Sequence, residues 1–146
     1  MFSCFSAEAR LMIFGSWHLA NKAGEKEIKP EHIFLSILKK NKQVVVQFLN
    51  EPTVDYIKQA VEKNLGTNTV HDYNWVSVTY SPQSKKIIDI AHELRITHGK
   101  KHIELEHVLY GIVQEETSGP AKLLIKYEIN VSRMQEHIRT TQPGPS

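Results

Sequence analysis

The sequence predicts an all-α domain in which one four-helix unit occurs twice. Two copies of the pattern Ile-x-x-Glu-His, Ile28 to His32 and Ile103 to His107, stand 75 residues apart. When residues 6–38 are laid over residues 81–113 without a gap, many more positions agree than the roughly two expected for unrelated sequences. The apolar residues in both copies recur with helical rather than alternating spacing. The identical pairs include Ser6/Ser81, Leu19/Leu94, Gly24/Gly99, Lys26/Lys101, Ile28/Ile103, Glu31/Glu106, His32/His107 and Ile37/Ile112.

The first helix of each half has a recognisable start and end. Ser6 and Ser81 are residue types that favour the N-cap, and Pro82 follows at the first helical position, where its missing N–H costs nothing. Gly24 and Gly99 stand where these helices should end, because glycine tolerates the positive φ of a C-cap. Between those limits we expect one apolar face per helix: Met12, Ile13, Leu19 and Ala20 in the first half, and Ile87, Ile88, Ala91 and Leu94 in the second.

Three further helices follow in each half, which makes eight in all. The second helix begins near Pro30 and near Leu105. Polar breaks at Asn41 and at residues 118–120 separate it from a short third helix. That third helix is expected over Val44 to Leu49 and over Ala121 to Tyr127. A last helix carries apolar residues at helical spacing: Ile57, Val61 and Leu65, then Met134 and Ile138.

These elements give the domain boundaries. We expect one domain over residues 1–139, with a first repeat at about 5–65, a connection at 66–80 and a second repeat at about 81–139. The connection alternates polar and apolar residues near its end, so a short extended segment over the core is expected there. Residues 140–146, rich in proline and glycine, are expected to form a linker or a disordered tail. Because a half of this size folds alone only marginally, packing of one repeat on the other should supply much of the stability.

Composition excludes several function classes. The net charge is only +2 and no basic stripe is present, so we expect no nucleic-acid partner. Neither a secretory signal nor a membrane span is recognisable, and the single Cys4 fits a reducing, cytoplasmic setting. His98 and His102 are separated by a predicted turn, so no metal site and no cofactor are expected. A hydrolase built on Glu31 and His32 is disfavoured because the pair occurs twice without a separate nucleophile.

The quoted residues resemble a known family, the double Clp repeat found as the N-terminal domain of the Clp group of AAA+ unfoldases. The likeness covers essentially residues 1–139. It is carried by Phe5-Ser6-x-x-Ala9-Arg10, Ile28-x-x-Glu31-His32, Tyr80-Ser81-Pro82 and Ile103-x-x-Glu106-His107-x-Leu109-x-Gly111. The resemblance implies two four-helix Clp repeats related by a pseudo-twofold axis. It also implies a non-enzymatic module that captures substrate or adaptor proteins for an ATP-driven ring. The chain has no Gly-x-x-x-x-Gly-Lys-Ser/Thr loop, so it is not itself the motor.

Two duplicated pairs, Ser6 with Glu31 and Ser81 with Glu106, are the candidate ligand-binding residues. A serine at a helix N-terminus can seat an anion such as phosphate, and a nearby carboxylate can bind a guanidinium group. Phosphoarginine combines both groups, and the resemblance implies such recognition at matching positions in some relatives from Gram-positive bacteria. The alternative is that the serines are only N-caps and the glutamates only first-turn carboxylates.

We therefore expect a protein-binding module that serves a Clp-type AAA+ ring, present in the same polypeptide or docked in trans, for unfolding and proteolysis. The alternative is a stand-alone regulator that sequesters adaptors or phosphoarginine-marked proteins. In either case the isolated domain is expected to be monomeric.

Overall fold

The computed structural model describes residues 4–65 and 78–141 and confirms the all-α fold with four helices in each half of the chain. The predicted connection lies largely outside the described residues, as do residues 142–146 of the predicted tail. Within the described part the elements, in chain order, are Ala7–Lys22 (α1), Glu27–Ile28 (β1), Pro30–Asn41 (α2), Gln43–Val46 (α3), Glu51–Leu65 (α4), Thr79–Tyr80 (β2), Pro82–Thr97 (α5), Leu105–Gln114 (α6), Gly119–Lys126 (α7) and Val131–Thr140 (α8).

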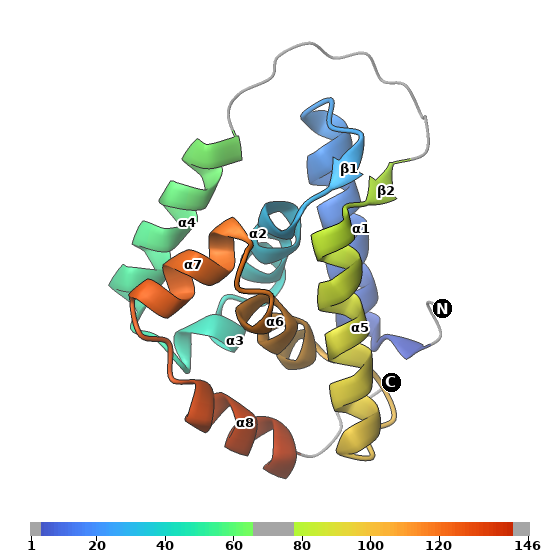
Figure 1. Cartoon of the computed structure of the whole chain (residues 1–146), viewed down its shortest axis with the longest axis vertical. Coiled ribbons are helices and arrows are strands. Elements are labelled where there is room, and N and C mark those ends of the chain that lie inside the picture. The colour runs from blue at the N-terminus through green and yellow to red at the C-terminus, as the bar shows by residue number, and fades with distance from the viewer. Residues whose placement is uncertain (1–3, 66–77, 142–146) are drawn as a thin grey trace.

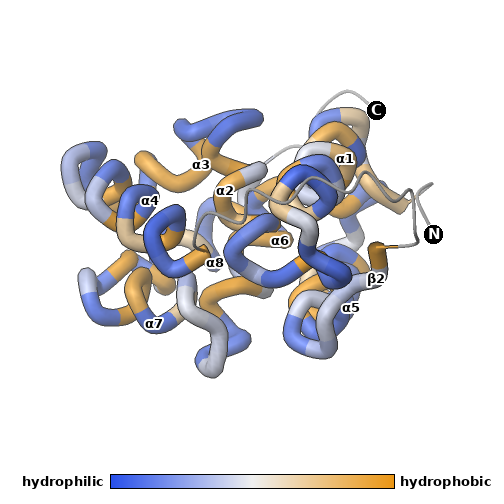
Figure 2. The backbone as a smooth tube through the Cα atoms, turned by 90° about the horizontal axis from the view of Figure 1, so that it is seen from above, coloured by the Kyte–Doolittle hydropathy of each residue, from blue (hydrophilic) through white to orange (hydrophobic). Residues whose placement is uncertain are grey.

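The second helix of each half occupies the middle of the molecule. In Figure 1, α2 and α6 lie between the pair α1 and α5 on one side and the pair α4 and α7 on the other. The view from above in Figure 2 shows the same order, with long hydrophilic stretches on the outer helices α4 and α5. Burial follows from this position, because Ile33, Phe34 and Ile37 of α2 are fully buried, and so are Val108, Leu109 and Ile112 of α6.

Short strands interlock the two halves. β1 pairs with β2 in parallel, with Ile28 opposite Tyr80, and a single bridge joins Phe5 to Ile103. A shift of 75 residues converts one pairing into the other, since Phe5 becomes Tyr80 and Ile28 becomes Ile103. The segment that opens each repeat therefore pairs with the other repeat. Because Phe5, Ile28 and Ile103 are each at most 3% exposed, this exchange belongs to the core.

The ends of the first helices agree with the sequence prediction. The Ser6 hydroxyl accepts a hydrogen bond from Ala9 N at 3.1 Å, and the Ser81 hydroxyl accepts one from Ser84 N at 3.1 Å. Gly24 and Gly99 have φ values of 71° and 64°, as their C-cap positions require. The third helix of the first half ends at Val46, earlier than the predicted Leu49.

The first two helices of each repeat approach closely, but the two repeats achieve this with different residues. In repeat 1 the Ser36 hydroxyl of α2 donates to Met12 O of α1 at 2.6 Å. In repeat 2 the equivalent position is Gly111, where an added Cβ would stand 2.5 Å from Ile87 O.

Within residues 4–65 and 78–141, no helix combines the length and the apolar character that a membrane span needs.

Candidate binding sites

The strand exchange decides which serine lies near which glutamate. Ser6 N donates to Ile103 O at 3.0 Å, which places Ser6 beside the strand that leads into α6 and Glu106. Ser81 N likewise donates to Ile28 O at 3.0 Å, beside the start of α2. The predicted pairing of Ser6 with Glu31 and of Ser81 with Glu106 is therefore wrong. The two sites cross the repeats, as Ser6 with Glu106 and Ser81 with Glu31. The sequence prediction paired residues within one repeat, whereas the segment that opens each repeat pairs with a strand of the other repeat.

The Ser6–Glu106 site is strongly acidic. Glu106 stands in the first turn of α6, and Glu8 stands in the first turn of α1. Burial raises the pKa of Glu106, and the negative charges of Glu104 and Glu8 raise this pKa further, against a lowering by a backbone hydrogen bond. Two further carboxylates therefore lie close enough to act on Glu106, and this negative charge favours a cationic ligand.

The Ser81–Glu31 site has a different charge. By the same shift of 75 residues, Gln83 replaces Glu8 and Lys29 replaces Glu104. Lys29 is partly exposed and forms an ion pair with Glu25 at 3.3 Å. The two substitutions remove two carboxylates, so this site is less acidic than the Ser6–Glu106 site. Sequence reasoning could have found this difference by extending the repeat comparison to the residues that flank each motif.

Glu31 also reaches the third helix of the other repeat. A Cβ built on Gly119, the first residue of α7, would lie 3.1 Å from Glu31 Oε2. The carboxylate thus lies at the N-terminus of α7, where the helix dipole stabilises negative charge. Part of the role of Glu31 is therefore structural.

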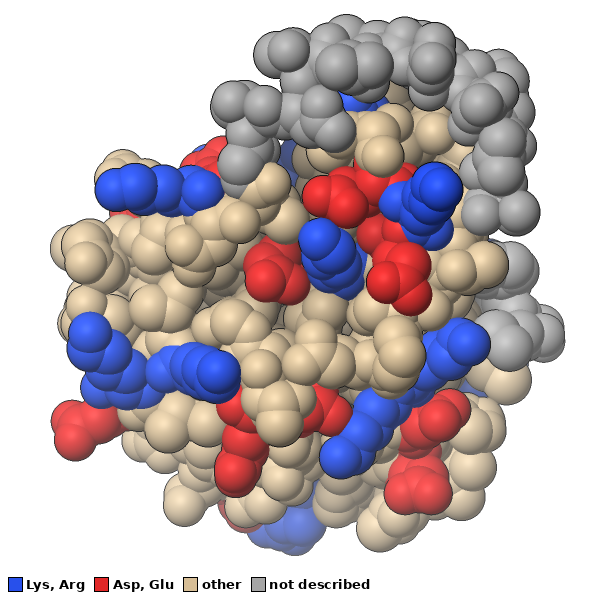
Figure 3. Space-filling model, turned by 45° about the horizontal axis from the view of Figure 1, so that its top comes forward, with Lys and Arg blue, Asp and Glu red and all other residues tan. Residues whose placement is uncertain are grey.

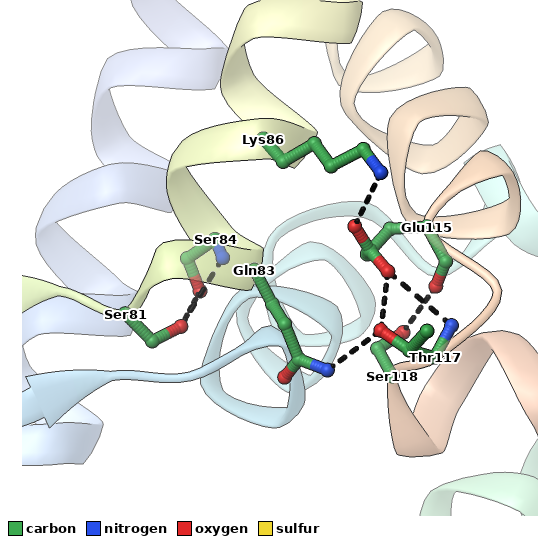
Figure 4. Close-up of polar contacts among 7 residues, drawn as sticks. All are labelled: Ser81, Gln83, Ser84, Lys86, Glu115, Thr117 and Ser118. Atoms are coloured by element: carbon green, nitrogen blue, oxygen red, sulfur yellow. Dashed lines mark hydrogen bonds and ion pairs between the residues drawn. The ribbon is translucent and has the colours of Figure 1, made fainter.

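A network of polar side chains begins two residues after Ser81, at Gln83 (Figure 4). Gln83 Nε2 donates to Thr117 Oγ1 at 2.8 Å, and Thr117 donates through both its hydroxyl and its backbone N–H to Glu115. Lys86 Nζ lies 3.4 Å from the other Glu115 oxygen. The Thr117 hydroxyl holds the pKa of Glu115 below its ordinary value, with Lys86 adding to the effect, although Glu115 is only 4% exposed. The network ties the first turns of α5 to the loop between α6 and α7, and sequence analysis missed it.

The two histidines of the repeated motif have local, structural partners. His32 Nδ1 accepts the backbone N–H of Lys29 at 2.9 Å, and His107 Nδ1 accepts that of Glu104 at 2.8 Å. Each histidine thus caps its own helix. Burial lowers the pKa of both side chains to about 4, so they are neutral at physiological pH. Within the described ranges, no group of three or more His, Cys, Asp or Glu side chains could hold a metal ion.

An apolar hollow lies beside the strand pair, a feature that the sequence did not reveal. It has a volume of about 280 Å³ and is lined by residues of α1, of β1 and of the segment that ends in β2. The lining includes Ile13, Trp17, Ile28 and Tyr80. Apolar contact is therefore available close to the polar groups of the Ser81 segment.

Comparison with known proteins identifies the family of this fold. A family model described as Clp repeat (R) N-terminal domain matches residues 4–127. The chain is 24% identical over 140 residues to chaperone protein ClpB of Oceanobacillus iheyensis. It is 21% identical over 145 residues to the negative regulator of genetic competence ClpC/MecB of Bacillus subtilis. Each match covers 94% of this chain but only 17% of the relative, so the chain spans about a sixth of these proteins.

Solved structures of two other N-terminal domains have a similar fold. The N-terminal domain of Hsp104 from Candida albicans superposes with a TM-score of 0.76 at 14% identity and covers 95% of this chain and 93% of that one. The N-terminal domain of the chaperone ClpD from Arabidopsis thaliana gives a TM-score of 0.66 at 16% identity, over 96% and 95% of the two chains. At these identities the likeness establishes the fold.

Proposed function

The chain belongs to the family of Clp repeat (R) N-terminal domains, and from that premise we propose that it captures substrate or adaptor proteins for a Clp-type AAA+ ring. The observation that carries the proposal is the pair of repeat-related sites, Ser6–Glu106 and Ser81–Glu31, built on one interlocked body. Two sites of different charge on a fixed scaffold suit recognition of a polypeptide at two points. The ring, in the same polypeptide or in trans, would supply ATP-driven unfolding and delivery to proteolysis.

The proposed role is binding without chemistry. Both serine hydroxyls accept backbone N–H groups as N-caps, which is a structural role. Both motif histidines use Nδ1 to accept a backbone N–H and are neutral. These contacts support a non-enzymatic module. A hexameric ring would carry several copies, and such multivalency raises overall affinity without a large interface on any one domain.

Charge on the surface is compatible with a protein partner in the cytoplasm. Figure 3 shows basic and acidic side chains interspersed over the face that it draws, rather than one continuous basic field. A polyanion such as nucleic acid gains little from such a surface. We therefore propose substrate and adaptor proteins, and neither nucleic acid nor a membrane, as partners of a monomeric domain.

The capture role is tested with an immobilised copy of the chain and a reduced, carboxymethylated unfolded protein as the probe. We expect retention of the probe, and at least a several-fold loss of retention in the double variant Glu31→Gln with Glu106→Gln. The matched control is Glu93→Gln with Glu128→Gln, which removes two exposed carboxylates elsewhere. Failure of the wild-type chain to retain the probe contradicts the proposal. Equal retention of the probe by both double variants would show that the probe binds outside the two sites.

The alternative, a stand-alone regulator that sequesters adaptors or phosphoarginine-marked proteins, is favoured by one observation. Lys29 and Gln83 stand where the other site has Glu104 and Glu8, so the Ser81–Glu31 site repels a phosphoryl group less, and Glu31 gives it a group for the guanidinium. In the Ser6–Glu106 site the three carboxylates repel a phosphoryl group. A chain whose natural polypeptide ends before any phosphate-loop ATPase would support this alternative over the ring-bound module.

Titration of ¹⁵N-labelled protein with free phosphoarginine tests the alternative. We expect NMR shifts around Ser81, Gln83 and Glu31, and weaker shifts around Ser6. Glu31→Gln should remove the first set while Glu106→Gln leaves it. Absence of shifts at both sites at about 5 mM ligand, far above a micromolar Kd, disposes of phosphoarginine recognition.

A further inference from the structure

We propose that repeat 1 carries a docking groove for an acidic protein segment that inserts a leucine-sized side chain. The groove has a volume of about 350 Å³ and lies between the last turns of α1, the outer face of α2 and the middle of α4. None of its lining residues belongs to the Ser6–Glu106 or Ser81–Glu31 site. The inference rests on the proposed function only in taking the ligand to be a protein.

The floor of the groove is apolar. Leu19 of α1 and Leu35 and Leu38 of α2 line it. Leu19 and Leu35 are only partly buried, whereas Leu38 is 6% exposed. An incoming leucine side chain would complete the burial of this surface, which is favourable in proportion to the apolar area removed from water.

The rim of the groove carries two exposed lysines. Lys39 and Lys58 are exposed, and neither takes part in an ion pair within the described part of the chain. Lys42, which also lines the groove, is different, because it is held by Glu51 at 2.9 Å and by Asp55 at 2.6 Å. Carboxylates on either side of the inserted side chain can therefore pair with Lys39 and Lys58.

Comparison of the repeats shows that this groove is particular to repeat 1. The last helices of the two repeats, α4 and α8, can be aligned by their buried residues, Ile57 with Met134 and Val61 with Ile138. This alignment places Gln135 at the position of Lys58. Tyr110 stands at the position of Leu35. In repeat 2 these two side chains satisfy each other, since Gln135 Nε2 donates to the Tyr110 hydroxyl at 3.1 Å. In repeat 1 the residue at the position of Tyr110 is Leu35, which has no hydroxyl to bind Lys58. Lys58 can therefore pair with an external partner.

The charges around the groove favour an acidic peptide over a nucleic acid. Glu62 lines the same groove, and Glu51 and Asp55 are paired with Lys42. These carboxylates would repel a continuous phosphate backbone. A peptide with carboxylates only beside its apolar residue can place them over Lys39 and Lys58, and its uncharged backbone is not repelled by Glu62.

The test uses ¹⁵N-labelled protein and the synthetic peptide acetyl-Glu-Glu-Leu-Leu-Glu-Glu-amide. We expect shift changes at Leu35, Leu38, Lys39 and Lys58, and a loss of affinity of about tenfold in Lys39→Glu with Lys58→Glu, because two attractions become repulsions. The matched control, Lys63→Glu with Lys101→Glu, changes the net charge equally at exposed lysines outside the groove and should bind as the wild type does. A peptide with serine in place of both leucines should bind much more weakly.

A second arm keeps the test independent of net charge. The peptide acetyl-Lys-Lys-Leu-Leu-Lys-Lys-amide should bind the Lys39→Glu, Lys58→Glu variant better than it binds the wild type. The proposal is overturned if the acidic peptide causes no shifts at about 2 mM, if its shifts lie elsewhere, or if both double variants lose affinity equally. If the acidic peptide does not bind but the unfolded probe is still retained, only the groove proposal fails. If the probe is not retained but the peptide binds, only the proposed capture role fails.

Discussion

At the scale of single residues, His32 and His107 should control how stability depends on pH. Both pKa values fall from 6.5 to about 4 on folding, mainly through burial. A histidine with a lowered folded pKa stabilises the fold fully above pH 6.5, and this contribution is lost as the pH falls toward 4. Each side chain then lowers the free energy of unfolding by up to about 1.4 kcal/mol per pH unit within that window.

Glutamine at these positions separates titration from capping. Its amide oxygen can accept the same backbone N–H, as in a capping box, but does not titrate near neutral pH. We expect His32→Gln with His107→Gln to flatten the pH dependence of denaturant unfolding between pH 6.5 and 4, while the exposed His18→Gln control leaves it unchanged. Glu106 acts in the opposite direction, because its raised folded pKa stabilises the fold as the pH falls. An unchanged slope in the double variant would show that other groups dominate.

At the scale of helices, the close crossing of α5 and α6 depends on Gly111. A Cβ there would stand 2.5 Å from Ile87 O, a backbone atom that cannot turn aside. We expect Gly111→Ala to lower the free energy of unfolding by about 1–3 kcal/mol, the usual cost of overpacking. Chemical denaturation measures this change.

Gly119→Ala is the matched control. Its Cβ would meet only the end of the Glu31 side chain, at 3.1 Å, and alanine favours the helix that begins there. We expect a change within about 0.5 kcal/mol. Equal losses in the two variants would mean that loss of glycine itself, rather than contact with Ile87 O, sets the cost.

Much of this helical architecture could be predicted from local patterns. Ser6, Pro82 and Gly99 act on the residues next to them, so the starts and ends of α1 and α5 follow from sequence. The pairing of each serine with its glutamate could not be predicted, because it depends on strands that exchange between distant repeats. The contact of Thr117 with Gln83 likewise joins a loop to a helix residue 34 positions away, and no local pattern marks it.

At the scale of the whole molecule, the strand exchange makes each half incomplete without the other. Phe5 and Ile28 are buried against partners from the opposite repeat, and the hydrogen bonds from Ser6 N and Ser81 N also cross between repeats. A separated half would expose these apolar side chains and leave those backbone groups unpaired, and a chain of that size has little stability to spare.

We therefore expect polypeptides 1–70 and 71–146 to be largely unfolded alone and to regain the helical structure when mixed in equal amounts. Circular dichroism and NMR spectra of each fragment and of the mixture measure this, with the intact chain as the reference. Reassembly should be weakened by Ile103→Ser, which removes a 2% exposed partner of Phe5, but not by Ile96→Ser, whose side chain is 57% exposed. Cooperative folding of fragment 1–70 by itself would show that the four helices of one repeat suffice and that the exchanged strands add only orientation.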